Sequence, residues 1–211
     1  MARLSERQKK EIQTPYKLSI KEHKEIKSFN GNWNDNKLKS IKDKIRKHYK
    51  HEQGKLCCFC KLPFRDVVEV EHFVPKKGSK GRIEFSFYSK NLGVACRHCN
   101  SKKSTNNDMI PWDRSPYPSA GQYFKIIHPQ FDKYLDHIAI EDKSRYVAKS
   151  LKGYNTIERC KLYDTNITDV LVKYMKYEDD PLIQGILRIR ELQGEWGQIT
   201  NKIDRLFNLL F

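Results

Sequence analysis

The sequence predicts an α+β protein, in which a small core between two pairs of cysteines is embedded in a mainly helical chain. Three observations predict this class. Two CxxC pairs stand 35 residues apart, a short alternating run rich in β-branched residues lies between them, and apolar residues recur at helical spacing on either side. We expect three parts: a basic helical region over 1–54, the core over 55–110, and a mainly helical region over 111–211.

The first region divides into an arm and a helix. Residues 1–35 are polar and Lys-rich, which favours a loose helical arm. From Asp35 or Asn36, either of which can cap a helix, apolar residues recur at helical spacing until Gly54, with lysines on the other face. The apolar positions are Leu38, Ile41, Ile45 and Tyr49. This helix leads directly to the first cysteine pair.

Inside the core, residues 67–73 alternate and are rich in β-branched side chains, so they predict a strand that ends at Pro75. Residues 76–82 contain two glycines and predict a basic loop. Residues 83–95 have a mixed pattern and lead into the second cysteine pair. A short helix is expected over 99–105.

After the core, residues 106–129 contain four prolines and predict irregular structure, where we place the domain boundary. From about residue 130 the pattern is helical, with a short strand near 137–140 and a further helix that begins at 179–181. The last segment predicts one apolar stripe, which either packs internally, as most such stripes do, or forms a protein interface. The stripe consists of Ile199, Ile203, Leu206 and Leu210.

The net charge of +15 is unevenly distributed along the chain. Residues 1–50 carry 15 Lys and Arg against 6 Asp and Glu, residues 51–104 carry 11 against 5, and residues 105–211 carry 15 of each. All excess positive charge therefore lies in the first half, which favours a polyanion partner such as nucleic acid over lysines that only keep the protein soluble. No run is long and apolar enough to span a bilayer, so we expect a cytoplasmic protein without membrane contact.

The cysteine pairs predict a metal site. Cys57 with Cys60 and Cys96 with Cys99 have the spacing of two knuckles that supply one tetrahedral thiolate site, which is typical of structural Zn²⁺. A disulfide framework does not fit a reducing cytoplasm. Cys58 is a competing ligand, but its direct neighbours fit the site better. We expect Cys160, within a helical pattern, to be a buried free thiol.

A set of polar residues accompanies the cysteines. In chain order it runs Glu71-His72 with Pro75, then Asn91-Leu92, then Asn100 and Lys103 directly after the second pair. In order, spacing and identity this arrangement resembles the HNH endonucleases of the ββα-metal type over residues 55–105. The resemblance implies a small ββα-metal core with a zinc knuckle pair, which cleaves DNA to leave 5′-phosphate and 3′-hydroxyl ends.

The resemblance also implies a role for each polar residue. His72 would be the general base that activates water, and Asn91 would orient it through the other ring nitrogen. Glu71 and Asn100 would hold a divalent cation, Mg²⁺ or Mn²⁺, through oxygen ligands. Simpler roles stay open, because Asn100 can cap a helix and Asn91 can be a turn residue.

The strand geometry adds a condition to these roles. Glu71 and His72 would point to opposite faces of an ideal strand, so the motif requires a twist or a strand end at this position. Glu69 lies on the same face as Glu71 and is a second candidate ligand.

Basic residues close to the motif are candidates for contact with DNA phosphate, and RNA stays open as a substrate. They are Lys76, Lys77, Lys80, Arg82 and Lys103. The alternative for the first four is an ordinary solvated loop, and Lys103 matches a family position that holds phosphate or the final turn.

Less specifically, the whole chain resembles the HNH subunits of Septu-like anti-phage systems, in which such a nuclease pairs with an ABC-type ATPase. The segments that carry this resemblance are the basic N-terminal region, His128-Pro129, Phe131-Asp132 with Tyr134, and residues 156–162.

Three functions are therefore open. The residues together favour a zinc-knuckle HNH endonuclease acting on DNA in prokaryotic antiviral defence. A non-catalytic zinc-knuckle protein that binds nucleic acid is the rival, although a binder needs only the cysteines and the basic surface. A nuclease that is silent until a partner activates it is equally compatible with the sequence.

Overall fold

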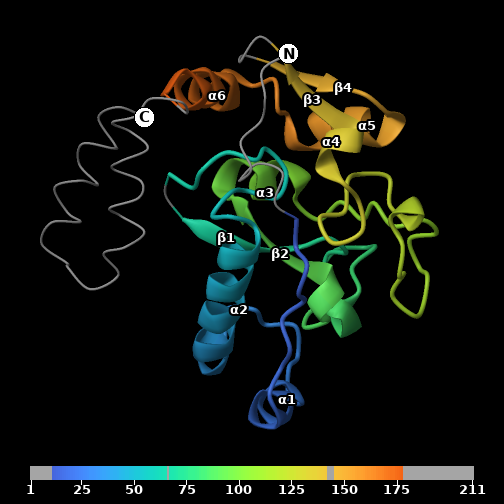
Figure 1. Ribbon diagram of the computed structural model, residues 1–211. Helices are drawn as coiled ribbons and strands as arrows, with labels where there is room; N and C mark the ends of the chain where they lie inside the picture. The colour runs from blue at the N-terminus through green and yellow to red at the C-terminus, as the bar shows by residue number, and fades with distance from the viewer. Residues whose placement is uncertain (1–10, 66, 142–144, 178–211) are drawn as a thin grey trace, which may run out of the picture.

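The computed structural model describes residues 11–65, 67–141 and 145–177 (Figure 1). Its α-helices are α1 (Ile20–Ile26), α2 (Lys39–Glu52), α3 (Arg97–Lys103), α4 (Tyr134–His137), α5 (Leu151–Cys160) and α6 (Thr165–Tyr177). Its strands are β1 (Val68–His72), β2 (Leu92–Cys96), β3 (Ile138–Glu141) and β4 (Arg145–Ala148). β1 pairs with β2 and β3 with β4, so two small antiparallel hairpins lie among helices and the mixed α+β class is confirmed.

The helix expected after the arm is confirmed. The Asp35 carboxylate accepts a hydrogen bond from the Lys37 amide at 2.9 Å, a 3₁₀ turn follows over Asn36–Leu38, and α2 continues from there. The apolar face of α2 is buried against β1 and β2, in a cluster that contains Ile41, Ile45, Tyr49, Val68, Leu92 and Val94. Gly54 follows with a φ of 63°, a conformation that glycine adopts at little cost. In the described part of the arm, only α1 is helical.

Gln53, at the end of α2, connects this helix to the hairpin. Its side chain is 1% exposed, accepts from the Val94 amide at 2.8 Å and donates to the Val94 carbonyl at 2.8 Å. It also donates to the Leu56 carbonyl at 2.9 Å. The side chain thereby gives the Val94 amide a partner and ties the end of α2 to β2 and to the segment before the first knuckle.

The hairpin β1–β2 lies between two helices. Its register runs from Val68 opposite Cys96 to His72 opposite Leu92. Side chains alternate along a strand, so Val68 and Val70 face α2, while Glu69 and Glu71 face α3. Figure 1 shows α2 and α3 on opposite sides of this hairpin. β1 is one residue shorter at each end than the strand expected over 67–73. α3 begins two residues before the helix expected over 99–105, within the second cysteine pair.

The described residues after 130 are less helical than expected, because they include the hairpin of β3 and β4. The short strand predicted near 137–140 is β3, but its partner β4 was not predicted, because its residues show no clean alternation between buried and exposed side chains. One core cluster joins the first cysteine knuckle, with Phe59, to β3, α5 and α6. The boundary proposed near residue 110 stays a prediction, although the two sides share this cluster. The expected helix from 179 and the stripe over 199–210 lie outside the described residues.

Within the described ranges, no helix combines the length and the apolar character needed to cross a membrane.

Candidate functional site

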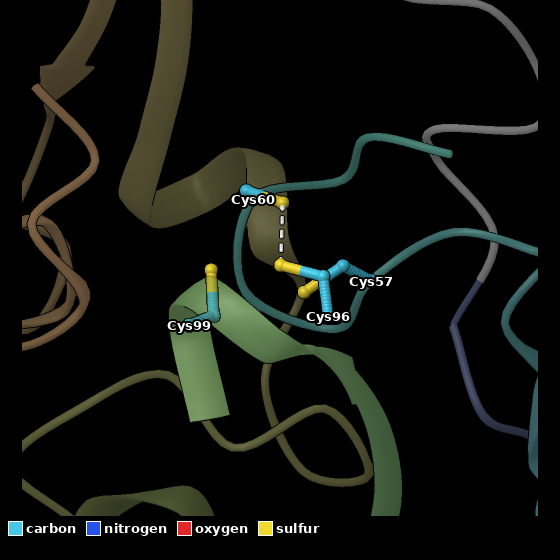
Figure 2. Close-up of side chains that lie close together, drawn as sticks. All are labelled: Cys57, Cys60, Cys96 and Cys99. Carbon is cyan, nitrogen blue, oxygen red and sulfur yellow. Dashed lines mark hydrogen bonds between the residues drawn. The ribbon is translucent and has the colours of Figure 1, made fainter. Parts of the chain in front are cut away.

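The four predicted zinc cysteines come together. The sulfur atoms of Cys57, Cys60, Cys96 and Cys99 all lie within 4.8 Å of one another, and the Cys60 and Cys96 sulfurs are 4.0 Å apart (Figure 2). A zinc ion with Zn–S bonds of about 2.3 Å requires sulfurs about 3.8 Å apart. A disulfide requires about 2.05 Å, and all six cysteines are free. The cluster therefore has the dimensions of a tetrahedral thiolate site.

Local backbone geometry builds this cluster. The first knuckle is a tight turn, in which the Lys61 amide donates to the Cys57 carbonyl at 3.0 Å and Lys61 has a φ of 54°. Cys96 ends β2 and stands at the N-cap of α3, one helical turn before Cys99. The hairpin and α3 thus bring the second pair to the first.

The electrostatics of the cluster call for a cation. Burial alone would raise the pKa of the Cys57 thiol, but hydrogen bonds from the neighbouring thiols bring this pKa well below its usual value. The pKa of Cys60 is raised, first by its hydrogen bond to Cys57. Buried thiolates repel one another unless a cation neutralises them. Zn²⁺ does this in structural four-cysteine sites. Cys58 lies outside the cluster, and Cys160 is a buried free thiol as expected.

Glu71 is buried and points toward α3. Its carboxylate lies 2.8 Å from the Lys103 ammonium, and the two side chains are 2% and 0% exposed. Lys103 also donates to the His72 carbonyl at 3.0 Å. Burial raises the pKa of Glu71, whereas the charge of Lys103 acts to lower it. The carboxylate that the resemblance assigns to a metal thus carries a buried lysine as its partner.

His72 ends β1 and lies on the other face of the strand. Its Nε2 is 3.1 Å from the Ser86 carbonyl, and the Trp33 ring meets it edge to face with centroids 4.5 Å apart. The residue is 6% exposed. Burial holds the pKa of His72 well below 6.5, and the nearby charge of Lys76 lowers it further. The imidazole is therefore neutral at physiological pH, with its hydrogen on Nε2 because a carbonyl can only accept.

Asn91 does not fill the place expected for it. His72 Nε2 donates to the Ser86 carbonyl instead. Asn91 binds the backbone after His72 and the backbone before Ser86. Its Oδ1 accepts from the Val74 amide at 2.7 Å, and its Nδ2 donates to the carbonyls of Val74 and Phe85 at 3.0 Å each. Phe85 precedes Ser86, so the backbone that Asn91 binds is next to the carbonyl that binds His72.

Asn100 also has a different partner from the one expected. Its amide donates to Glu69, the second candidate ligand, while Glu71 binds Lys103. Asn100 and Lys103 are three residues apart on α3 and therefore share the face that meets Glu69 and Glu71. Two carboxylates and an amide thus line the contact between β1 and α3.

A curated protein of Vibrio cholerae serotype O1 biovar El Tor, named "Retron Vc95 putative HNH endonuclease", is 28% identical to the chain over 94 residues. The chain has a distant HNH homologue. The aligned residues cover 42% of this chain and 46% of the relative, so the match spans about half of the relative's length. No family model and no solved structure matches. The four-cysteine cluster is consistent with the zinc site of an HNH protein.

The predicted phosphate-binding residues divide by exposure. Lys77 and Lys80 are exposed and fit a contact with phosphate. Lys76 is half-buried with its ammonium 5.1 Å from the centre of the Trp33 ring, and burial lowers its pKa.

The other two basic residues are engaged within the protein. The Arg82 guanidinium lies 2.6 Å from the Glu84 carboxylate. Lys103 is 0% exposed and bound to Glu71, so the expected contact of Lys103 with phosphate does not fit its position.

Trp33 and Ser86 contact the candidate base and were not identified from the sequence. Trp33 lies in the arm, 39 positions before His72, in a stretch rich in Asn and Gly that carries no regular pattern. Ser86 contributes a backbone carbonyl, which no residue type encodes. The one available signal was an aromatic residue between two lysine-rich segments.

Proposed function

We propose that the chain is a metal-dependent HNH endonuclease of the ββα-metal type, which hydrolyses DNA phosphodiester bonds in prokaryotic antiviral defence. The observation that carries the proposal is His72, a neutral imidazole fixed at the end of β1, the strand whose first residue lies opposite Cys96 of the four-cysteine cluster. The strand order and the helix directly after β2 agree with a ββα core. The homologue, named for a retron and an HNH endonuclease, supports both the activity and the setting.

The chemistry assigned to His72 follows from its tautomer. Nε2–H donates to the Ser86 carbonyl, so Nδ1 keeps its lone pair and can accept a proton from water. The lowered pKa keeps this lone pair free at working pH. The activated water would attack phosphorus and leave 5′-phosphate and 3′-hydroxyl ends.

The proposed cation is Mg²⁺ or Mn²⁺, held from Glu71 and Asn100 with Glu69 as the further oxygen ligand. Oxygen donors of this kind suit hard divalent cations, and all three lie at the contact between β1 and α3. The bound cation would supply charge stabilisation to the scissile phosphate and the leaving oxygen. The Lys103 ammonium lies 2.8 Å from the Glu71 carboxylate, so the cation would share this carboxylate with Lys103.

DNA would approach from the side of the exposed Lys77 and Lys80. The Trp33 ring, which contacts the proposed general base His72, has the ammonium groups of Lys42 and Lys76 at 5.9 and 5.1 Å from its centre. Such a combination suits a sugar-phosphate chain with bases that stack. RNA shares this chemistry and belongs in the same assay.

The rival function is a non-catalytic binder of nucleic acid. The burial of Glu71 and His72 favours it. Glu71 is paired and His72 is 6% exposed, which suits a folding role as well as a catalytic one. The same burial supports control by a partner, and the resemblance to Septu-like systems makes an ABC-type ATPase the proposed partner.

The test is cleavage of supercoiled plasmid, single-stranded DNA and RNA by zinc-loaded protein with Mg²⁺ or Mn²⁺. His72→Ala is compared with His23→Ala, which changes an exposed histidine on α1. We expect the first variant to lose cleavage, by about 100-fold or more as for removal of a general base, and the second to keep it. Equal cleavage by both variants would exclude His72 as the base. Binding of DNA without cleavage by the wild type would favour the non-catalytic binder.

A further inference from the structure

A second buried histidine lies behind the candidate site. His128 is 0% exposed and is enclosed by aromatic rings, with Phe131 stacked on it at 4.2 Å and Phe124 and Phe73 at 4.5 and 4.6 Å. Its backbone is held as well, because the His128 amide donates to the Asp132 carboxylate at 2.8 Å. The proposed chemistry makes no use of this imidazole, although burying its polar ring atoms requires partners for them.

The partners of His128 determine its tautomer. The Gln130 backbone amide, which can only donate, lies 3.3 Å from Nδ1, so Nδ1 is the acceptor. The hydrogen of the neutral ring is therefore on Nε2, which lies 3.0 Å from the Tyr117 hydroxyl. Burial lowers the pKa of His128 well below 6.5 and so favours this neutral form.

The direction of the next bond follows. Because Tyr117 accepts from His128, its own hydrogen is available to Asn91 Oδ1, 3.1 Å away. Asn91 is 0% exposed, and its amide also accepts from Val74 and donates to Val74 and Phe85. The chain of donors therefore runs in one direction, from His128 to Tyr117 to Asn91.

Asn91 is the point where this chain meets the base. It binds the amide and carbonyl of Val74, two residues after His72, and the carbonyl of Phe85, next to Ser86. Ser86 in turn accepts from His72 Nε2. Rotation of the Asn91 amide would release both segments that determine where the imidazole lies.

We propose that Tyr117 and His128 are positioning residues, which orient the Asn91 amide and through it the imidazole of His72. The proposal rests on the proposed nuclease function for its kinetic consequence. Tyr117 is 7% and His128 0% exposed, so neither is placed to touch a substrate. Their loss should slow the chemical step and leave substrate binding unchanged.

The kinetic test uses Tyr117→Phe and His128→Phe, which keep the aromatic packing and remove the polar atoms. We expect each to lower kcat about 10-fold with KM within twofold, since a misplaced catalytic group costs rate. The double variant should lose no more than either single one, because both act through Asn91. His128→Gln, which restores a donor near Nε2, should recover part of kcat.

Tyr88→Phe is the matched control. Tyr88 packs on Tyr117 with ring centroids 4.9 Å apart but is 41% exposed. Its kcat should stay within twofold of the wild type. A rise of KM at unchanged kcat in Tyr117→Phe, or additive losses in the double variant, would overturn the proposal.

A second readout does not depend on activity. The hydrogen of His72 Nε2, bound to Ser86, can be followed by nitrogen-edited NMR of the imidazole. We expect Tyr117→Phe to speed its exchange with water at least fivefold, while Tyr88→Phe leaves it unchanged. Unchanged exchange in both variants would refute the positioning role. If the wild type cuts no substrate, the proposed function is wrong. The exchange rates of the His72 Nε2 hydrogen in Tyr117→Phe and Tyr88→Phe would still test the positioning role.

Discussion

The buried pair of Glu71 and Lys103 allows a quantitative prediction. The two charges are 2.8 Å apart, with 2% and 0% of the side chains exposed, so solvent screens them little. Removing one partner of such a pair costs about 3–5 kcal/mol, because the other charge stays buried alone. In Lys103→Met the His72 carbonyl also loses a donor, which adds about 1 kcal/mol.

The double variant with Glu71→Met and Lys103→Met should behave differently. Both charges are absent, and apolar side chains of similar length fill the space, which is often neutral for a buried pair. Only the missing bond to His72 remains, so we expect the double variant to lie within about 2 kcal/mol of the wild type. It should be more stable than either single variant, with a coupling energy of about 5 kcal/mol or more from these figures.

The assay is urea unfolding of the zinc-loaded proteins at neutral pH, followed by tryptophan fluorescence. Lys102→Met is the matched control, since Lys102 is 45% exposed and forms a surface pair with Asp164 at 3.3 Å. Such a pair contributes at most about 1 kcal/mol. If Lys103→Met costs no more than this control, or if the two single effects add in the double variant, the pair is not buried as described.

Three further predictions concern the metal, acid and pH. Purified protein should hold about one zinc per chain, and Cys96→Ser should lose both zinc and stability in metal analysis and melting, whereas Cys58→Ala keeps the zinc. The pKa of Glu22 is lowered to about 2, first by the hydrogen bond from Lys44, so its contribution is complete above pH 4.5 and is lost as the pH falls toward 2. Glu22→Gln should therefore cost about 2 kcal/mol at neutral pH and little in acid, as measured by urea unfolding. Because the pKa of His128 is lowered by burial and then by Lys152, the unfolded chain alone gains this proton below pH 6.5. The free energy of unfolding should therefore decrease as the pH is lowered below 6.5, by up to about 1.4 kcal/mol per pH unit. The slope should be smaller in His128→Phe.

Features fixed by short-range sequence were predictable. The CxxC spacing determines which sulfurs can share a metal, so the cluster followed from four positions alone. The alternation over 67–73 and the helical spacing over 38–49 each reflect one buried face, and both elements are present. The motif requires a twist or a strand end at Glu71 and His72, and β1 does end at His72, but the two side chains still turn to different faces.

Partners set by tertiary packing were not predictable. Glu69 and Glu71 occupy equivalent positions on the strand, and only the placement of α3 decides that Asn100 meets the first and Lys103 the second. Tyr117 lies in a proline-rich stretch with no periodicity, 26 positions from Asn91. A polar network between loops leaves no repeat in the sequence, because each bond depends on a chain path rather than a local pattern.

The hairpin β1–β2 is held at both ends, and by different chemistry. At one end, Val68 is opposite Cys96, a member of the thiolate cluster, so loss of zinc should loosen the knuckle and the start of α3. At the other end, His72 is opposite Leu92, and the Phe73 amide donates to the Asn91 carbonyl at 3.1 Å. A defect at the first end should therefore appear as lost stability, and a defect behind Asn91 as lost rate in a protein that still binds zinc. If Tyr117→Phe lost zinc as Cys96→Ser should, the two ends would be one cooperative unit and this separation would be wrong.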